Sequence, residues 1–511
     1  MDNVFDFRNR LINEYSSFSR SFSKVSAQDI LSKVELEYDR GRYWPEPLIQ
    51  INPNYKRQST VQQLAHEGML HASCSHIFQT GKTEGKAADL HLYVHQLQAL
   101  AKAQKQQSYV VTTGTGSGKS LAFFVPIIDR ILKAKQADPQ KRTRAIVIYP
   151  MNALANSQLE ELDKFLHGYP DDQKPFTVAR YTGQESDADR KQIADNPPDI
   201  LLTNFMMLEL ILTRFEDVDR RVVEHCQGLE FLVLDELHTY RGRQGADVAL
   251  LVRRLRERLQ AHQLVCIGTS ATMSSTGTQA DRNQTVASVA SLLFGAQITE
   301  HDVIGETLER VTNPAKDIEA VKSLLKPALL KESYHWPDFA AFSDDPLAVW
   351  VELSLGIELP LDEPPRRARP VTLGDAAKRL ADDAQCTVEE AHAGLQRFLV
   401  AAHDVKTPQG RAPFAFKLHQ FISGPGKVLA TLEPEGVRHI TLDAQRYAPG
   451  RQDEGTQLYP VHFCRDCGQE YHPVWRSGQS QVEYAPREID DISGDDDENA
   501  RYGFLCPARP R

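Results

Sequence analysis

One short glycine-rich segment of the sequence could hold phosphate groups. It reads GTGSGKS from Gly114 to Ser120, directly after the apolar run 108–113 and directly before a helical stretch. Glycine lets a backbone approach phosphate oxygens closely, and the start of a helix adds partial positive charge. Lys119 is placed to reach the β- and γ-phosphates, and the Ser120 hydroxyl is placed to bind Mg²⁺. The usual pattern has a glycine where this chain has Thr113. The residues predicted to contact a nucleotide are Thr115, Gly116, Ser117, Gly118, Lys119 and Ser120.

A second run, FLVLDELH, places acidic side chains at the end of an apolar stretch. Asp235 follows four apolar residues and is expected to hold Mg²⁺, while Glu236 is expected to polarise the attacking water. Phosphoryl transfer asks mainly for positioning and charge stabilisation, so a few such groups suffice on one side of a site. The alternative interpretation is a strand that ends in ordinary surface acids. The predicted catalytic set is Lys119, Asp235, Glu236 and His238.

Six short apolar runs must position these groups. They span residues 108–114, 144–150, 176–182, 199–204, 230–236 and 264–271. The runs are rich in valine and isoleucine and nearly continuous, as buried parallel strands are. Amphipathic helical stretches, such as 119–134 and 153–166, fall between them. This alternation predicts a doubly wound α/β domain with a parallel sheet.

The segment Asp235-Glu236-Leu237-His238 resembles the DExH box of superfamily 2 helicases. The other motifs of that family's first motor domain appear in order along the chain: Gln96, YPMNALANSQ (149–158), Thr182-Gly183 and Thr203-Asn204 before this box, and Ser270-Ala271-Thr272 after it. The resemblance implies a RecA-like P-loop NTPase domain that binds ATP and Mg²⁺. It also implies that Gln96 reads the adenine and that Ser270 and Thr272 couple the nucleotide to the bound strand.

The same resemblance implies a nucleic-acid surface along the strand ends. The backbone-contacting residues that it indicates are Pro150, Asn152, Gly183, Thr203 and Asn204. Arg241 and Arg243 follow the DExH box directly, and arginine is suited to phosphate contact. Further arginines lie at 253–258, where a solvated helix face explains them equally well.

A narrower resemblance extends over more of the chain. The stretch DELHTYRGRQGADVALLVRRLRERL (235–259) is similar to large bacterial helicases of the Lhr type, including those of phage-defence systems such as DISARM and Druantia. Segments 44–55, 303–312 and 463–471 are similar to that group as well. Superfamily 2 motors use two RecA-like domains, and residues 276–511 show no second set of motifs. We therefore expect the front part of a longer helicase, or a split subunit, whose second motor domain acts in cis or in trans.

The composition and the pattern along the chain suggest four regions. They are a helical N-terminal lobe (1–88), the RecA-like ATP-binding domain (89–312), a helical accessory insertion (313–450) and a CxxC-containing tail with an acidic loop (451–511). The last two form a mixed α+β accessory region. Within it, two helices are expected at 371–405, the second capped by Thr387 and Glu390. They fit a helical bundle better than a helix-turn-helix.

Cys464 and Cys467 have the spacing of half a zinc site, and a reduced pair without metal is the alternative. The chain has 511 residues and only seven cysteines, which favours a reducing cytoplasm over a disulfide framework. No apolar run approaches the roughly 20 residues that cross a bilayer, so no membrane partner is expected. The net charge is −10, so any nucleic acid must bind a local basic surface.

These observations together predict an ATP-dependent helicase or translocase, with DNA favoured over RNA as its nucleic acid and a role in antiviral defence. Two alternatives stay open: a non-hydrolysing scaffold that binds nucleic acid or a partner, and an RNA-remodelling helicase.

Overall fold

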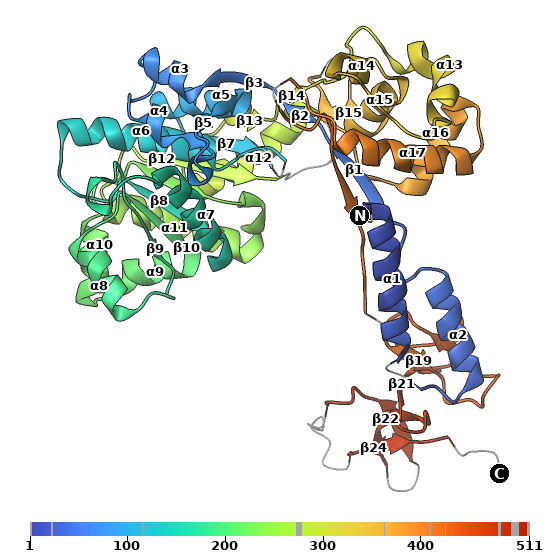
Figure 1. The fold of residues 1–511 in the computed structure, drawn as a ribbon. Coiled ribbons are helices and arrows are strands. Elements are labelled where there is room, and N and C mark those ends of the chain that lie inside the picture. Colours follow the sequence, from blue (N-terminus) through green and yellow to red (C-terminus); the bar gives the residue numbers. More distant parts are fainter. Residues whose placement is uncertain are drawn as a thin grey trace. The chain divides into compact units, whose positions relative to one another are not determined.

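The computed structural model describes residues 3–21, 24–114, 116–271, 278–361, 363–408, 410–424, 426–478, 482–491 and 500–507. Thr115, Thr272 and most of the acidic run of the tail lie outside the described residues. The chain divides into two compact units (Figure 1). The α/β unit comprises residues 54–309 and 359–366, and the accessory unit comprises residues 1–53, 310–358 and 367–511.

A seven-stranded sheet forms the centre of the α/β unit. Its strands are β7 (Tyr109–Thr112), β8 (Ala145–Tyr149), β9 (Val178–Tyr181), β10 (Ile200–Asn204), β11 (Phe231–Leu234), β12 (Val265–Ser270) and β13 (Val303–Gly305). The order across the sheet is β13-β7-β12-β11-β8-β10-β9, and every pairing is parallel. The six apolar runs become six of these strands, which confirms the predicted α/β class with a parallel sheet. The sequence pattern did not indicate the short strand β13.

Helices cover both faces of this sheet. They are α5 (Val94–Gln104), α6 (Leu121–Ala137), α7 (Asn152–Leu166), α8 (Asp187–Asp195), α9 (Phe205–Thr213), α10 (Asp217–Glu224), α11 (Gly242–Arg258) and α12 (Gln279–Phe294). Successive strand residues point to opposite faces: Val111 belongs to one core with α5, α6 and α7, and Val110 to another with α9, α11 and α12. Burial on both faces explains why the strand sequences are continuously apolar.

Smaller elements precede the first central strand. They are β2 (Asn54–Tyr55), β3 (Arg57–Thr60), α3 (Val61–His66), α4 (Cys74–Ile77), β4 (Gln79–Thr80), β5 (Ala88–Asp89) and β6 (His91–Tyr93). Helix α3 begins at a capping box, in which Thr60 Oγ1 accepts from Gln63 N and Gln63 Oε1 accepts from Thr60 N. Strand β2 pairs with β14 (Leu308–Glu309), so the two ends of this unit's main segment meet.

The accessory unit combines helices with antiparallel sheets. Its helices are α1 (Val4–Ser21), α2 (Gln28–Asp39), α13 (Ile318–Leu329), α14 (Phe339–Ser343), α15 (Pro346–Val351), α16 (Leu373–Ala384) and α17 (Val388–His403). Strand β1 (Leu48–Asn52) lies between β17 (Val371–Thr372) and β18 (Ala415–His419). Helices α13, α15, α16 and α17 share one hydrophobic core around Trp350, and α17 begins at the predicted Thr387–Glu390 capping box. This unit confirms the mixed accessory region.

The tail of the accessory unit is a second antiparallel sheet. Its strands are β19 (Val428–Ala430), β20 (Ile440–Thr441), β21 (Tyr459–Phe463), β22 (Glu470–Ser477), β23 (Glu483–Pro486) and β24 (Arg501–Leu505). The short strands β15 (Ile357–Glu358) and β16 (Arg366–Arg367) pair with each other. None of the helices in the described parts of the chain is long and apolar enough to cross a membrane.

Candidate nucleotide site and nucleic-acid interface

The phosphate-binding loop and the acidic box meet at one edge of the parallel sheet. The loop begins directly after β7, Asp235 directly follows β11, and Ser270 ends β12. Strand β12 lies between β7 and β11 in the sheet. The three segments are therefore at the carboxyl ends of adjacent strands, where open α/β sheets bind their ligands.

Two glycines give the loop its shape. Gly116 has φ +80° and Gly118 has φ +66°, a left-handed region that favours glycine. A Cβ at Gly118 would lie 2.7 Å from Gln96 Nε2, so a larger residue would displace that side chain. Thr113, the departure from the usual pattern, is buried and its Oγ1 lies 2.6 Å from Ser117 Oγ. The residue that replaces the usual glycine, Thr113, therefore contacts Ser117 of the loop through its hydroxyl group.

The side chains of two consecutive residues of α5 contact carbonyl groups of the loop. Gln96 Nε2 donates to Gly118 O at 2.9 Å, which places the predicted adenine-reading residue against the loop. His95 Nε2 lies 3.0 Å from Ser117 O, and the ring is fully buried. Burial lowers the pKa of His95, so the neutral ring is favoured. His95 is not among the residues predicted from the sequence, because only its place next to Gln96 points to the site.

A chain of polar contacts links the loop to the box. Lys119 Nζ lies 3.3 Å from Glu236 Oε1, and Glu236 Oε2 lies 3.2 Å from His238 Nδ1. The same His238 nitrogen is 3.4 Å from Ser270 Oγ. The structure therefore brings together four residues that the sequence separates by up to about 150 positions. Thr272, the other predicted coupling residue, lies outside the described part of the chain.

Asp235 faces the same space from a more buried position. Thr269 Oγ1 donates to Asp235 Oδ1 and accepts from Glu236 N at 3.1 Å. Burial raises the pKa of Asp235, because removal from water disfavours the charged carboxylate. A bound cation reverses that balance by stabilising the negative charge. Thr269 is a further site residue that the sequence analysis missed.

Two buried hydroxyl groups lie near the acids without a hydrogen bond. Tyr149 Oη and Tyr240 Oη have no hydrogen-bond partner among the described residues. Burial raises the pKa of both phenols, and the charge of Asp235 raises it further. Buried polar atoms usually have partners. This edge of the sheet therefore has unused polar capacity beside its carboxylates, which suits a site for Mg²⁺, water and phosphate.

Glu236 has an unusual backbone conformation. Its φ is 54° and its ψ is 57°, in the left-handed region that residues other than glycine rarely adopt. The bond from its N–H to Thr269 Oγ1 helps to hold this conformation. Sparsely populated conformations of this kind cost about 1–3 kcal/mol and cluster at active sites.

The predicted nucleic-acid residues gather at the ends of β8 and β10. Asn204 Nδ2 donates to Asn152 Oδ1 at 2.7 Å and to Thr182 O at 3.0 Å. Thr203 is buried, and its Oγ1 donates to Tyr181 O at 2.7 Å. These bonds fix the strand ends relative to each other, so Asn152, Asn204 and Thr203 form one connected group.

The other predicted contact residues differ in their availability. Pro150 is half-buried, and Gly183 is exposed with φ +88°, but its N–H donates to Glu185 Oε2 at 2.9 Å. Arg241 and Arg243 are exposed, and their side chains make no hydrogen bond or ion pair with another described residue. By contrast, Arg253, Arg254 and Arg256 bind Leu292 O, Glu209 and Phe294 O respectively. Positions 241 and 243 therefore remain the better candidates for phosphate contact.

The CxxC pair of the tail forms a tight turn. Cys464 N donates to Gln469 O at 2.9 Å, and Gly468 N donates to Cys464 O at 2.8 Å. Hydrogen bonds from the backbone of residues 466 and 467 lower the pKa of Cys464. No group of three or more His, Cys, Asp or Glu side chains is placed to hold a metal within the described ranges. Zinc binding by Cys464 and Cys467 stays a prediction.

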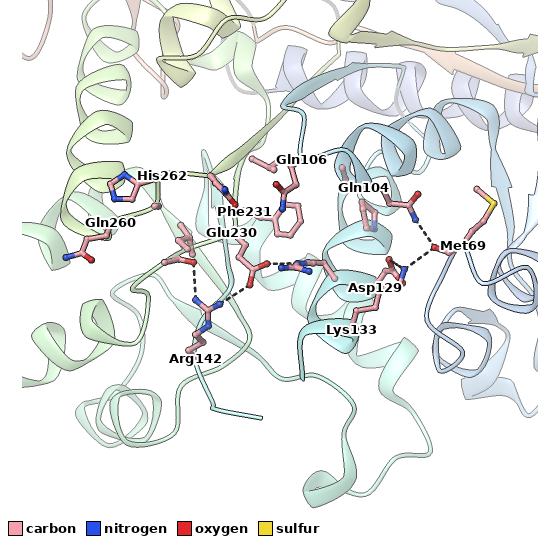
Figure 2. A pocket seen from close by; sticks show the side chains of 18 of the residues that line it. Met69, Gln104, Gln106, Asp129, Lys133, Arg142, Glu230, Phe231, Gln260 and His262 are labelled. Atoms are coloured by element: carbon pink, nitrogen blue, oxygen red, sulfur yellow. Dashed lines mark hydrogen bonds and ion pairs between the residues drawn. The ribbon is translucent and has the colours of Figure 1, made fainter. Parts of the chain in front are cut away.

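A cavity of about 770 Å³ lies at the opposite edge of the sheet (Figure 2). Gln106 precedes β7, Phe231 begins β11 and Val265 begins β12, so the cavity adjoins the amino-terminal ends of these strands. Arg130 and Arg142 both bind Glu230 beside it, at 2.7 and 3.1 Å. None of the predicted site residues lines this cavity. The loop and the box lie at the carboxyl edge instead, so the candidate site is separate from this cavity.

Comparison with known proteins agrees with this geometry. Residues 93–280 match the DEAD/DEAH box helicase family. The uncharacterized ATP-dependent helicase YprA of Bacillus subtilis (strain 168) is 34% identical over 186 residues, which cover 36% of this chain and 23% of that protein. The Lhr helicase/uracil glycosylase of Escherichia coli (strain K12) is 32% identical over 186 residues, which cover 34% of this chain and 12% of that protein.

A third relative bears the name Druantia. Druantia protein DruE of Escherichia coli (strain UMEA 4076-1) is 26% identical over 293 residues, covering 36% of this chain and 16% of that protein. The chain thus spans less than a quarter of the length of each of these relatives. These likenesses confirm the resemblance to Lhr-like helicases. The segment that matches the DEAD/DEAH box helicase family, residues 93–280, holds both the phosphate-binding loop and the acidic box.

Proposed function

We propose that residues 89–312 form the first motor domain of an ATP-dependent nucleic-acid helicase or translocase, with DNA favoured as the substrate. The observation that carries this proposal is the meeting of Lys119 and Glu236 at 3.3 Å, across the ends of β7 and β11. A phosphate-binding lysine and a water-polarising carboxylate must flank the same phosphate if they are to act on it.

The residues of this edge suit ATP and Mg²⁺. Lys119 and the N–H groups of the loop would bind the phosphates, and Gln96 would read the adenine. Ser120 and Asp235 would hold Mg²⁺, which supplies charge stabilisation to the transferred phosphoryl group when bound. Glu236 would accept a proton from the attacking water. His238, which contacts both Glu236 and Ser270, would link the nucleotide site to the end of β12. The buried, hydrogen-bond-free phenols beside Asp235 support a site that is completed by a ligand.

A second motor domain is part of this proposal. In related NTPases an arginine supplied from another domain is worth about 10³–10⁵ in rate. The sheets in the described parts of the accessory unit are built from antiparallel pairings, so we assign the second RecA-like domain to another part of the protein, in cis, or to a partner chain. The resemblance to helicases of phage-defence systems supports a role in antiviral defence.

Binding of Mg·ATP tests the nucleotide half of the proposal. We expect the 511-residue chain to bind a fluorescent ATP analogue in the presence of Mg²⁺, and EDTA to weaken that binding. Unlabelled ATP should compete better than GTP, because Gln96, beside the loop, is proposed to read the adenine. Titration by fluorescence anisotropy measures each case. A chain that binds nucleic acid but no Mg·ATP would instead be the non-hydrolysing scaffold.

Salt dependence tests the nucleic-acid half. The chain presents only part of a backbone-binding groove, with Asn152, Asn204, Arg241 and Arg243 as its candidates. Each phosphate neutralised on a single strand contributes about −0.7 to the slope of log affinity against log salt. With about two to four contacts, we expect a slope between about −1.4 and −2.8 for single-stranded DNA.

The measurement is a titration of labelled oligonucleotide at several salt concentrations. An RNA oligonucleotide of the same sequence is the matched comparison, since tighter RNA binding would favour the RNA-remodelling alternative. A slope near zero would show that recognition does not use these backbone contacts.

A further inference from the structure

Two neighbouring side chains of α5 bind two successive carbonyl groups of the phosphate-binding loop. His95 Nε2 lies 3.0 Å from Ser117 O, and Gln96 Nε2 lies 2.9 Å from Gly118 O. Both side chains are buried, at 0% and 2% exposure. Water therefore does not compete for these two bonds, and the loop is held from one side at two consecutive peptide groups.

Because the peptide bond is planar, these two contacts also fix the direction of the N–H groups that follow the two carbonyls. In a trans peptide the C=O and the following N–H point in opposite directions. Holding Ser117 O toward α5 therefore turns the Gly118 N–H away from it, and holding Gly118 O does the same for the Lys119 N–H. No hydrogen bond between described residues uses the N–H of Gly118 or Lys119. Such free N–H groups before a helix are the ones that bind phosphate oxygens.

The His95 ring is held for this bond. Its ring stacks on Tyr93, with centroids 5.6 Å apart and planes 19° apart, and meets the edge of Tyr55 at 5.8 Å. Because a carbonyl oxygen can only accept, Nε2 must carry the proton. The other ring nitrogen, Nδ1, is buried without a hydrogen-bond partner among the described residues. An apolar ring would avoid that cost, so the bond to Ser117 is what the imidazole adds to the site.

We propose that His95 is a positioning residue of the nucleotide site: it donates to Ser117 O and thereby aims the Gly118 N–H at the phosphates of a bound nucleotide. This inference rests on the proposed function of the loop as an ATP site. It assigns separate tasks to the two neighbours, since Gln96 is the residue proposed to read the adenine, whereas His95 acts only through the loop backbone.

Three substitutions separate this task from packing. His95→Gln keeps an N–H donor at the distance of Nε2, His95→Asn places its amide nearer the backbone and cannot reach Ser117, and His95→Leu removes the donor. We expect His95→Leu and His95→Asn to weaken Mg·ATP binding by about 2- to 12-fold, the range for one intramolecular hydrogen bond. Mg·GTP binding should fall by the same factor, because the effect reaches the phosphates and not the base. His95→Gln should bind within about twofold of the unchanged chain.

Nucleotide affinity and thermal melting of the 511-residue chain are measured together. If His95→Leu has a lowered melting temperature, the comparison of His95→Gln with His95→Asn tests the proposal, since only glutamine restores the donor to Ser117 O. The inference is overturned if His95→Asn binds Mg·ATP as tightly as the unchanged chain, or if His95→Gln is as weak as His95→Asn. A failure of the unchanged chain to bind Mg·ATP would overturn the proposed function itself, which distinguishes the two failures.

Discussion

Replacing Glu236 with glutamine should remove most ATP turnover while leaving Mg·ATP binding in place. Glutamine keeps the size of the side chain but loses the charge that accepts a proton from water. General-base catalysis contributes about 10²- to 10⁴-fold in rate, so we expect the turnover number to fall by that factor. Steady-state ATP hydrolysis by the complete protein, with its second motor domain present, measures the effect. Binding is measured separately by titration with a fluorescent ATP analogue.

Glu257→Gln is the matched control for this change. Glu257 is exposed on α11 of the same unit, and the substitution removes the same charge away from the site. It should leave turnover and binding unchanged. If Glu236→Gln loses Mg·ATP binding as well as turnover, then Glu236 belongs to the groups that hold the ligand, and its assignment as the base is wrong.

Replacing Lys119 with alanine should weaken Mg·ATP binding by about 10- to 150-fold or more, which corresponds to the loss of one hydrogen bond to a charged group. The fold should persist, because Lys119 contributes one ion pair, to Glu236, at the edge of the sheet. Its side chain is only 13% exposed, so its removal leaves the Glu236 carboxylate without its cation. We therefore expect a small decrease in melting temperature together with the loss of affinity.

Lys191→Ala provides the comparison for Lys119→Ala. Lys191 is exposed on α8, so its removal tests the effect of one lost positive charge on the unit as a whole. Nucleotide affinity should be the same as in the unchanged chain. Equal affinity in the Lys119→Ala protein would exclude this loop as the phosphate-binding site.

The sequence indicates the central sheet and the main site groups because both are local features. Burial on two faces makes each parallel strand a short, continuous apolar run, and six of the seven strands are readable in this way. The loop from Gly114 to Ser120 and the box around Asp235 each follow such a run directly. Once the runs are aligned as parallel strands, their carboxyl ends must meet at one edge.

The contacts that complete the site are long-range and leave no local pattern. Gly114 N donates to Glu306 Oε2 at 3.1 Å across 192 residues of sequence, and Thr269 reaches Asp235 across 34. Strand β13, next to β7, has only three residues, too few for a recognisable apolar run. In the accessory unit, β1 pairs with β18 more than 300 positions away. No spacing of residue types within one segment indicates such partners.

The left-handed backbone at Glu236 has a consequence for how this position can vary. Glycine, asparagine and aspartate are the residues that adopt such a backbone most readily. Glycine and asparagine have no carboxylate, and aspartate is one methylene too short to reach the place that Glu236 occupies. The backbone conformation therefore favours glycine, asparagine or aspartate at this position, whereas the carboxylate and its distance from the backbone require glutamate. Selection for thermal stability alone would replace this glutamate, so its retention in stabilised variants would report selection for turnover.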